Sequence, residues 1–149
     1  MHALLHCLPA HGITFDVMLT EKEESSDSTG GRTEAIRVAS KYNWMFMMDR
    51  AGADCANYEY DKDAAKWSGA LDRHGWDRTR GTSSCISKMK DAKVKAVNFG
   101  VGYKDEHSDE CHADIDTYLE QCERVAKFIR EFGEQRFGHP EQNGAPSEY

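Results

Sequence analysis

The 149-residue sequence has no apolar run approaching the roughly 20 residues of a membrane-spanning helix. Basic residues are outnumbered, with 19 Lys and Arg against 26 Asp and Glu, so the chain lacks the positive surface that attracts nucleic acid or anionic membrane. Its 5 cysteines form no Cys-x-x-Cys pair, and we expect no secretory leader, which favours a reducing compartment. These absences predict a soluble, cytoplasmic protein that binds neither nucleic acid nor membrane.

The sequence does contain an alternation of strand-like and helix-like segments. The length of the chain suits one domain with its own hydrophobic core. The predicted elements are helices at 1–8, 33–41, 62–74, 84–89 and 114–132, and strands at 13–20, 44–48, 57–60 and 94–99. This alternation predicts the α/β class, with a single domain over residues 1–137. The polar residues 138–149 are expected to form a flexible tail.

The stretch from Val97 to His112 has the layout of a functional loop. An apolar strand gives way to two glycines, and then to a polar segment in which His107 stands among four carboxylates. Permissive backbone after a rigid strand is a common way to present a histidine in the crevice beyond the strand end. A histidine beside acids is also typical of a solvated surface loop, so this stretch alone leaves both interpretations open.

Two other acidic positions follow predicted strands in the same way. Glu23 and Glu24 come just after strand 13–20, and Asp49 directly follows strand 44–48. A single acid at the end of a strand is commonly a turn former or a cap. Their shared placement favours a functional role, because open α/β sheets bind ligands beyond the carboxyl ends of their strands.

Taken in order, these three stretches resemble the co-catalytic zinc exopeptidases, the clan of aminopeptidases, carboxypeptidases and related amide hydrolases. The resemblance covers roughly residues 3–135 and is carried by Leu-Thr-Glu-Lys-Glu-Glu-Ser, Phe-Met-Met-Asp-Arg-Ala-Gly and Asn-Phe-Gly-Val-Gly-Tyr-Lys-Asp-Glu-His-Ser. It implies a mixed β-sheet flanked by helices, in a phosphorylase/hydrolase-like sandwich. It also implies a peptide or amide as the substrate.

The resemblance assigns a role to each of the four acidic and histidine residues. Glu23 would be the general base, and its neighbour Glu24 would be a zinc ligand, so that one carboxylate holds the cation while the other takes a proton from water. His107 would bind the same zinc as Glu24, and Asp49 would be the terminal ligand of a second zinc. Zinc is therefore the expected cofactor, with manganese or cobalt as substitutes.

The sequence also departs from the family pattern. The first His-x-Asp motif of the family and its metal-bridging aspartate have no counterpart here, so we expect the N-terminal part of the family domain to be missing. Cys85 stands where relatives tend to have an aspartate. With an incomplete site, the chain is expected to hold one zinc or none and to be inactive alone.

An alternative function is a non-catalytic remnant that serves as a binding or assembly module. A missing N-terminal segment would expose an unpaired sheet edge and apolar surface, and both invite a partner chain or a homodimer. A third interpretation, a redox or metal-buffering protein built on Cys111, His112 and Cys122, finds no support in the spacing of these residues.

Overall fold

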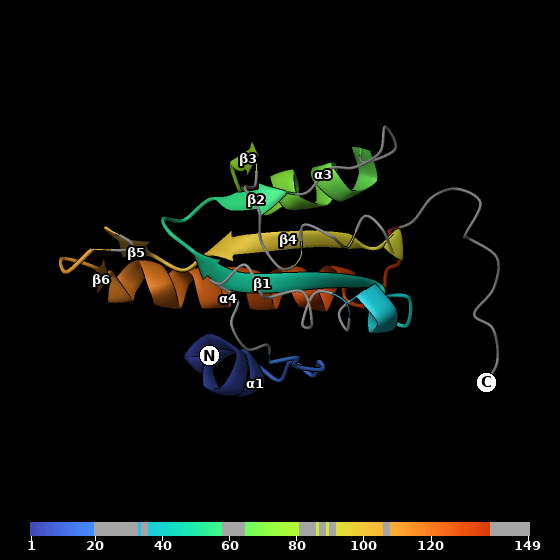
Figure 1. Cartoon of the computed structure of the whole chain (residues 1–149), viewed down its shortest axis with the longest axis horizontal. Coiled ribbons are helices and arrows are strands. Elements are labelled where there is room, and N and C mark those ends of the chain that lie inside the picture. The colour runs from blue at the N-terminus through green and yellow to red at the C-terminus, as the bar shows by residue number, and fades with distance from the viewer. Residues whose placement is uncertain are drawn as a thin grey trace.

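A computed structural model of the chain describes residues 1–19, 33, 36–57, 65–80, 86, 89, 92–105 and 108–137. Helices and strands combine in it into one α/β arrangement around a mixed sheet (Figure 1). The predicted α/β class is therefore confirmed. In the described part of the chain, no helix is long and apolar enough to cross a membrane. The predicted tail at 138–149 lies outside the described residues.

A four-stranded sheet forms the centre, in the order β1-β4-β2-β3. Its strands are β1 (Trp44–Arg50), β2 (Cys55–Asn57), β3 (Arg78–Arg80) and β4 (Lys95–Gly100). Strand β4 is parallel to β1 and antiparallel to β2, and β3 is parallel to β2. Every residue of β4 is buried, as its apolar run predicts, because strands flank it on both sides and side chains cover both of its faces.

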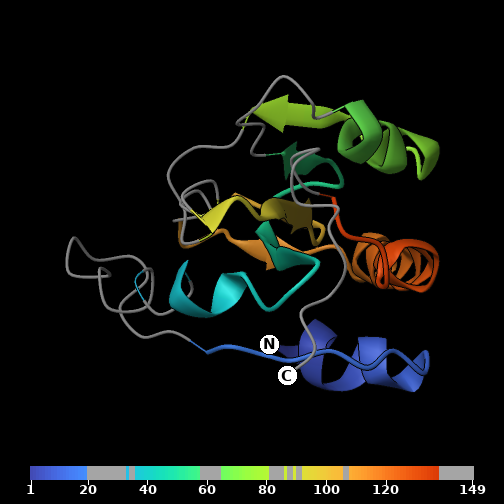
Figure 2. The same cartoon turned by 90° about the vertical axis from the view of Figure 1, so that its right-hand side faces the viewer.

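Helices cover the sheet unequally. Helices α3 (Ala65–Arg73) and α4 (Ile115–Phe132) and the N-terminal helix lie on one face, and a short helix at residues 36–39 lies toward the other (Figure 2). The helix-rich face packs mainly aromatic side chains, among them Trp44, Trp67, Trp76, Phe99, Phe128 and Phe132. The opposite face packs smaller side chains, among them Ala39, Ala56, Ile86, Met89, Val94 and Ala96.

Most predicted helices are confirmed with shifted ends. The N-terminal helix consists of η1 (Ala3–Cys7), a π-helical turn, and α1 (Leu8–Ala10), so it runs beyond the predicted end at residue 8. Helix α3 ends before Gly75, whose positive φ of 76° stops the helix as expected. Of the predicted helix at 84–89, Ile86 and Met89 are described, and both lie in 3₁₀ turns.

The predicted strand at 13–20 is wrong for residues 13–19, which form no strand. Ile13 is buried and the ring of Phe15 packs 5.7 Å from that of Phe46, but Leu19 on the same predicted face is 64% exposed. Alternating hydrophobicity requires a partner strand to become a ladder, and no described strand pairs with this segment.

Strand β3 was missed, because residues 78–80 lie in the segment predicted to be a loop. Its Arg-Thr-Arg sequence lacks the apolar alternation that marks a strand, but polar side chains suit its place at the edge of the sheet. The strand predicted at 57–60 begins earlier, as β2, and residues 58–60 lie outside the described part.

Helix α4 begins at a clear N-cap, Asp114. The carboxylate of Asp114 accepts a hydrogen bond from the backbone N–H of Thr117 at 2.9 Å. This bond lowers the pKa of Asp114 below its usual value, because it favours the charged carboxylate. Because this pKa is lower in the folded state, the cap stabilises the fold at pH values above the unfolded-state pKa. This contribution is lost as the pH falls through the folded-state pKa.

We therefore expect Asp114→Ala to lower the melting temperature at pH 7. The difference from wild type should shrink as pH falls below 3.8, the usual pKa of an aspartate. Thermal melts of both proteins between pH 2 and 7 would measure this difference in melting temperature. Asp114→Asn is the matched control, because asparagine keeps a capping oxygen without the charge. An Asp114→Ala difference that stays constant over this range would contradict the assignment.

Candidate functional site

The structure describes one of the four residues predicted to form the site. Asp49 lies in β1, whereas Glu23, Glu24 and His107 lie outside the described residues. The geometry of the site is therefore built from Asp49 and from the segments that surround it.

Asp49 lies near the carboxyl end of β1, with its side chain exposed. Its strand was predicted to stop at residue 48, but pairing with β4 continues to Arg50, which lies opposite Gly100. Because β1 and β4 are parallel, their carboxyl ends meet at the same edge of the sheet. The structure thus brings Asp49 next to the Gly-Val-Gly-Tyr turn at the end of β4.

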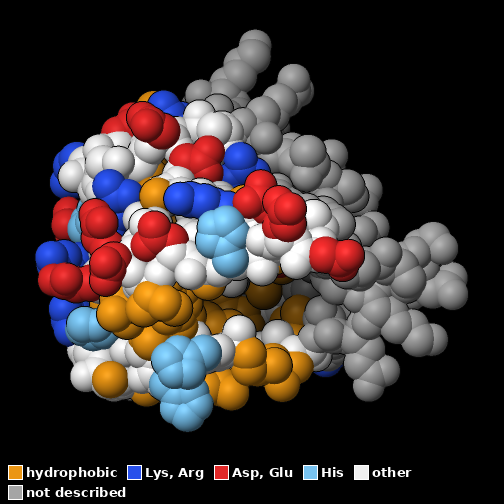
Figure 3. Space-filling view, turned by 90° about the vertical axis from the view of Figure 1, so that its left-hand side faces the viewer, with side chains coloured by type: hydrophobic (Ala, Val, Ile, Leu, Met, Phe, Trp, Pro, Cys, Tyr) orange, Lys and Arg blue, Asp and Glu red, His pale blue; other side chains and the backbone are white. Residues whose placement is uncertain are grey.

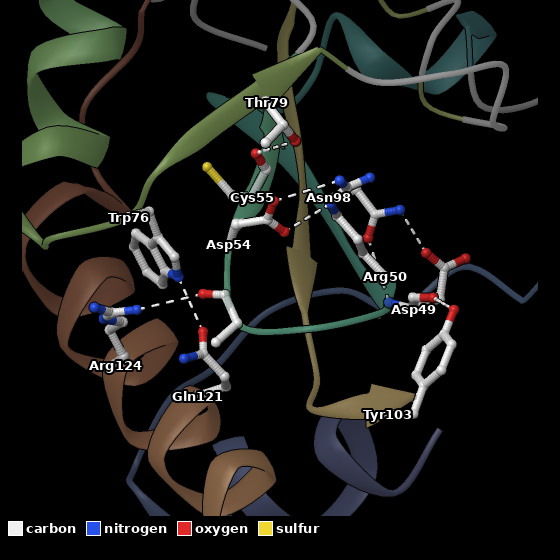
Figure 4. A network of polar contacts seen from close by, with 11 residues as sticks. Asp49, Arg50, Asp54, Cys55, Trp76, Thr79, Asn98, Tyr103, Gln121 and Arg124 are labelled. Atoms are coloured by element: carbon white, nitrogen blue, oxygen red, sulfur yellow. Dashed lines mark hydrogen bonds and ion pairs between the residues drawn. The ribbon is translucent and has the colours of Figure 1, made fainter. Parts of the chain in front are cut away.

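Asn98 of β4 holds the carboxylate of Asp49. Its side-chain amide donates a hydrogen bond to Asp49 Oδ1 at 2.5 Å, and its Oδ1 accepts one from the Asp49 backbone N–H at 3.3 Å (Figure 4). The register between the two strands shifts between Met47 and Arg50, and such a bulge redirects the side chains next to it. Asn98 is 7% exposed, so its amide is fixed in place beneath Asp49.

The hydroxyl of Tyr103 fixes the backbone at the same point, by donating a hydrogen bond to the carbonyl oxygen of Asp49. Sequence reasoning identified neither Asn98 nor Tyr103. The only signal for Asn98 is a polar residue between the apolar Val97 and Phe99, and this gains meaning once the β1–β4 pairing is known.

The two oxygens of the Asp49 carboxylate differ in their contacts with the described residues. Asp49 Oδ2 makes no hydrogen bond or ion pair with any residue that the structure describes. A carboxylate that is oriented through one oxygen by a neighbouring side chain fits the role of a metal ligand, since ligands are commonly held by hydrogen bonds from a second layer of residues. Among the described residues, no group of three or more His, Cys, Asp and Glu is placed to hold a metal ion.

Backbone hydrogen bonds fasten the loop after β1 onto the turn after β4. The pairs are Gly100 N–H to Asp54 O at 2.8 Å, Val101 N–H to Arg50 O at 2.9 Å, Gly102 N–H to Gly52 O at 2.8 Å and Gly52 N–H to Tyr103 O at 3.1 Å. Gly52 and Gly102 have φ of 70° and 80°, which favour glycine. The close backbone packing makes this edge of the sheet rigid.

Helix α4 supports the same loop from behind. The guanidinium of Arg124 donates hydrogen bonds to the carbonyl oxygens of Gly75 at 2.9 Å and Ala53 at 3.5 Å, and it lies over the ring of Trp76 (Figure 4). The indole N–H of Trp76 in turn donates to Gln121 at 3.0 Å. The loop next to Asp49 is thus tied to the aromatic core.

Tyr103 also opens a small hairpin, formed by β5 (Tyr103–Lys104) and β6 (His112–Ala113). The hydroxyl of Ser108 donates to the carbonyl oxygen of Asp105 at 2.7 Å, and the ring of His112 lies 3.7 Å from the Asp105 carboxylate. Asp105 and Ser108 are the described residues on either side of the segment that contains His107. Both therefore belong to a hairpin that starts at the residue bonded to Asp49.

The residues considered for a separate cysteine and histidine site do not come together. Cys111 is exposed in the hairpin, whereas Cys122 is buried on α4 with 1% exposure. The arrangement at the ends of β1 and β4 is instead one oriented carboxylate on a rigid sheet edge, beside a hairpin rich in acids. No protein-family model, curated protein or solved structure matches this chain.

Proposed function

We propose that the chain carries part of a zinc-dependent hydrolase site of the co-catalytic exopeptidase type, within a phosphorylase/hydrolase-like sandwich. In this proposal Glu24, Asp49 and His107 bind zinc, and Glu23 is the general base. The observation that supports it best is the pair of hydrogen bonds that Asn98 and Tyr103 donate to Asp49. They orient this predicted ligand beside the start of the segment that contains His107, another predicted ligand.

The chain length between Tyr103 and His107 is compatible with a shared site. Four residues span at most about 14 Å when fully extended, so the imidazole of His107 is within reach of the edge where Asp49 lies. At that edge, Asp49 Oδ1 accepts a hydrogen bond from Asn98, and Oδ2 makes none with a described residue. Carboxylate and imidazole ligands together suit zinc.

The proposed chemistry is the hydrolysis of a peptide or amide bond. Bound zinc would supply a Lewis acid that polarises the scissile carbonyl and lowers the pKa of a water molecule. Glu23, adjacent to a ligand but not itself one, would accept the proton from that water. Because the resemblance assigns three ligands to two zinc positions, we expect weak binding of one zinc and essentially no turnover by this chain alone.

A second candidate function is a non-catalytic assembly module, covered by a partner chain or by a second copy. Two observations favour it. Strand β1 is an edge strand among the described strands. Hydrophobic side chains also gather on one end of the molecule (Figure 3), and exposed hydrophobic residues of the described chain include Met1, Leu5, Ile115 and Leu119. The zinc experiment below separates the two functions, because an assembly module needs no metal.

We expect calorimetric titration with zinc to show binding that Asp49→Ala and His107→Ala each weaken by at least about 10-fold, since removing even an indirect partner of a metal costs that much. Zinc should also raise the melting temperature of the wild-type chain, because it binds the folded state. Asp109→Ala is the matched control. It removes an exposed carboxylate from the same hairpin without removing a proposed ligand.

Equal zinc affinities in the wild type, Asp49→Ala and His107→Ala would place the metal elsewhere and reject the proposed ligand set. Absence of any zinc binding by the folded wild-type chain would favour the assembly module. Loss of affinity in Asp109→Ala as large as that in His107→Ala would show that general negative charge, rather than a defined site, attracts the metal.

A further inference from the structure

The N-terminal helix packs against α4, and each of the two carries a cysteine. Cys7 ends η1 and is half-buried, whereas Cys122 is buried on α4. The Sγ atom of Cys7 lies 3.6 Å from the hydroxyl of Tyr118. Tyr118 is one helical turn before Cys122, so both side chains lie on the same side of α4. Burial, and after it the neighbouring Cys7, raises the pKa of the Cys122 thiol.

His2 completes this cluster at the surface. Its Nδ1 atom lies 3.5 Å from Cys7 Sγ and 2.8 Å from the Tyr118 hydroxyl, and its ring is exposed. His2 is therefore placed to accept the proton of the Cys7 thiol, and the thiolate is the reactive form of cysteine. Cys7 is also the more accessible of the two sulfurs.

The buried partner has the opposite character. Burial raises the pKa of Cys122 to about 11, so at neutral pH Cys122 is a thiol that reacts with peroxide more slowly than an accessible cysteine and loses its proton only when it attacks the oxidised Cys7. Burial also raises the pKa of Tyr118, which keeps its hydroxyl a hydrogen-bond donor. This contrast makes Cys7 the residue that reacts first and Cys122 the residue that reacts second.

We propose that Cys7 is a site of oxidation by hydrogen peroxide and that Cys122 resolves it as an intramolecular disulfide. Cys7 Sγ attacks one oxygen of the peroxide, an S–O bond forms and the O–O bond breaks. The thiol proton passes through His2 to the departing hydroxide, which leaves as water. Cys122 Sγ then attacks the Cys7 sulfur, so that an S–S bond forms, the S–O bond breaks and the hydroxyl leaves with the Cys122 proton as a second water.

The electrons balance, because two thiols lose two electrons and one peroxide becomes two waters. The other described cysteines lack this arrangement. Cys55 is buried with a pKa raised to about 12, and Cys111 is exposed in the hairpin. The disulfide would join the N-terminal helix covalently to α4, which packs against it.

Peroxide treatment of the full folded chain should lower its mass by about 2 Da, and non-reducing peptide mapping should find Cys7 linked to Cys122. Because the disulfide would join two residues that are far apart in the sequence, it should raise the melting temperature by about 5 to 10 °C. Dithiothreitol should reverse both the mass change and the change in melting temperature. Cys7→Ser should abolish the effect. Cys111→Ser, which removes an exposed cysteine outside the cluster, should retain it.

Dimedone, which traps sulfenic acids, provides a second readout. It should label Cys7 in peroxide-treated Cys122→Ser but not in the wild type, where the disulfide forms first. Accumulation of about 32 Da on Cys7 in the folded wild type, as sulfinic acid, would overturn the resolving role of Cys122. A map that links Cys7 to any other cysteine would overturn the pairing, and this outcome does not depend on the stability of a variant.

Discussion

Replacing Phe128 with alanine is expected to destabilise the fold by about 3 to 5 kcal/mol. The side chain is fully buried at the centre of the aromatic core. Six rings lie within 5.9 Å of it, centroid to centroid, and these belong to Trp44, Trp67, His74, Trp76, Phe99 and Phe132. Rings packed this closely from helices and strands cannot all move inward, so most of the volume would remain a cavity.

Urea denaturation followed by circular dichroism would measure the loss. Because domains are stable by only about 5 to 15 kcal/mol, the variant should unfold at much lower urea or be largely unfolded in water. Leu119→Ala is the control on the same helix, where a side chain that is 52% exposed should contribute less than about 1 kcal/mol. Similar losses in both variants would show that the aromatic cluster is not the centre of stability.

Gly100→Ala is expected to cost about 3 kcal/mol or more, and, under the proposed ligand set, to weaken zinc binding as well. A Cβ atom at this position would overlap the carbonyl oxygen of Gly52 and lie 2.9 Å from that of Asp54. Both obstacles are backbone atoms in the loop that is hydrogen-bonded to the turn after β4, so they cannot rotate away. The loop must move, and overpacking of this kind costs at least 1 to 3 kcal/mol in a side-chain core.

Gly69→Ala provides a matched control, for which the expected change in stability has the opposite sign. Gly69 lies within α3, where an added Cβ meets no atom within 4 Å, so alanine should stabilise the helix by roughly 1 kcal/mol. Urea melts and zinc titrations of both variants would test the expectation. A Gly100→Ala variant with wild-type stability would show that the loop at 51–54 can move to admit the added Cβ atom, despite its hydrogen bonds.

The elements that the sequence predicted well are those whose burial follows from a local pattern. Strand β4 is mostly apolar and proves to be central, and α4 has regular apolar spacing along one face. The strand predicted at 13–20 failed because alternation describes one face but does not supply a partner. Strand β3 was missed because an edge strand needs no apolar pattern.

The site shows the same division. The placement of Asp49 near the carboxyl end of a strand was predictable from its position after an apolar run. The amide of Asn98 beneath it was not, because this contact depends on the parallel pairing of strands that are far apart in the sequence, together with a bulge that no local pattern marks. Glu23, Glu24 and His107 stay predictions.

The central place of β4 also determines the order in which the chain can fold during its synthesis. Strand β1 pairs Trp44 with Lys95, so its apolar residues emerge about 50 positions before the strand that shelters them. At 5 to 20 residues per second, this delay is roughly 3 to 10 s. Throughout that interval the nascent chain exposes an unpaired hydrophobic segment. Chaperones bind segments of this kind, and without chaperones such segments aggregate.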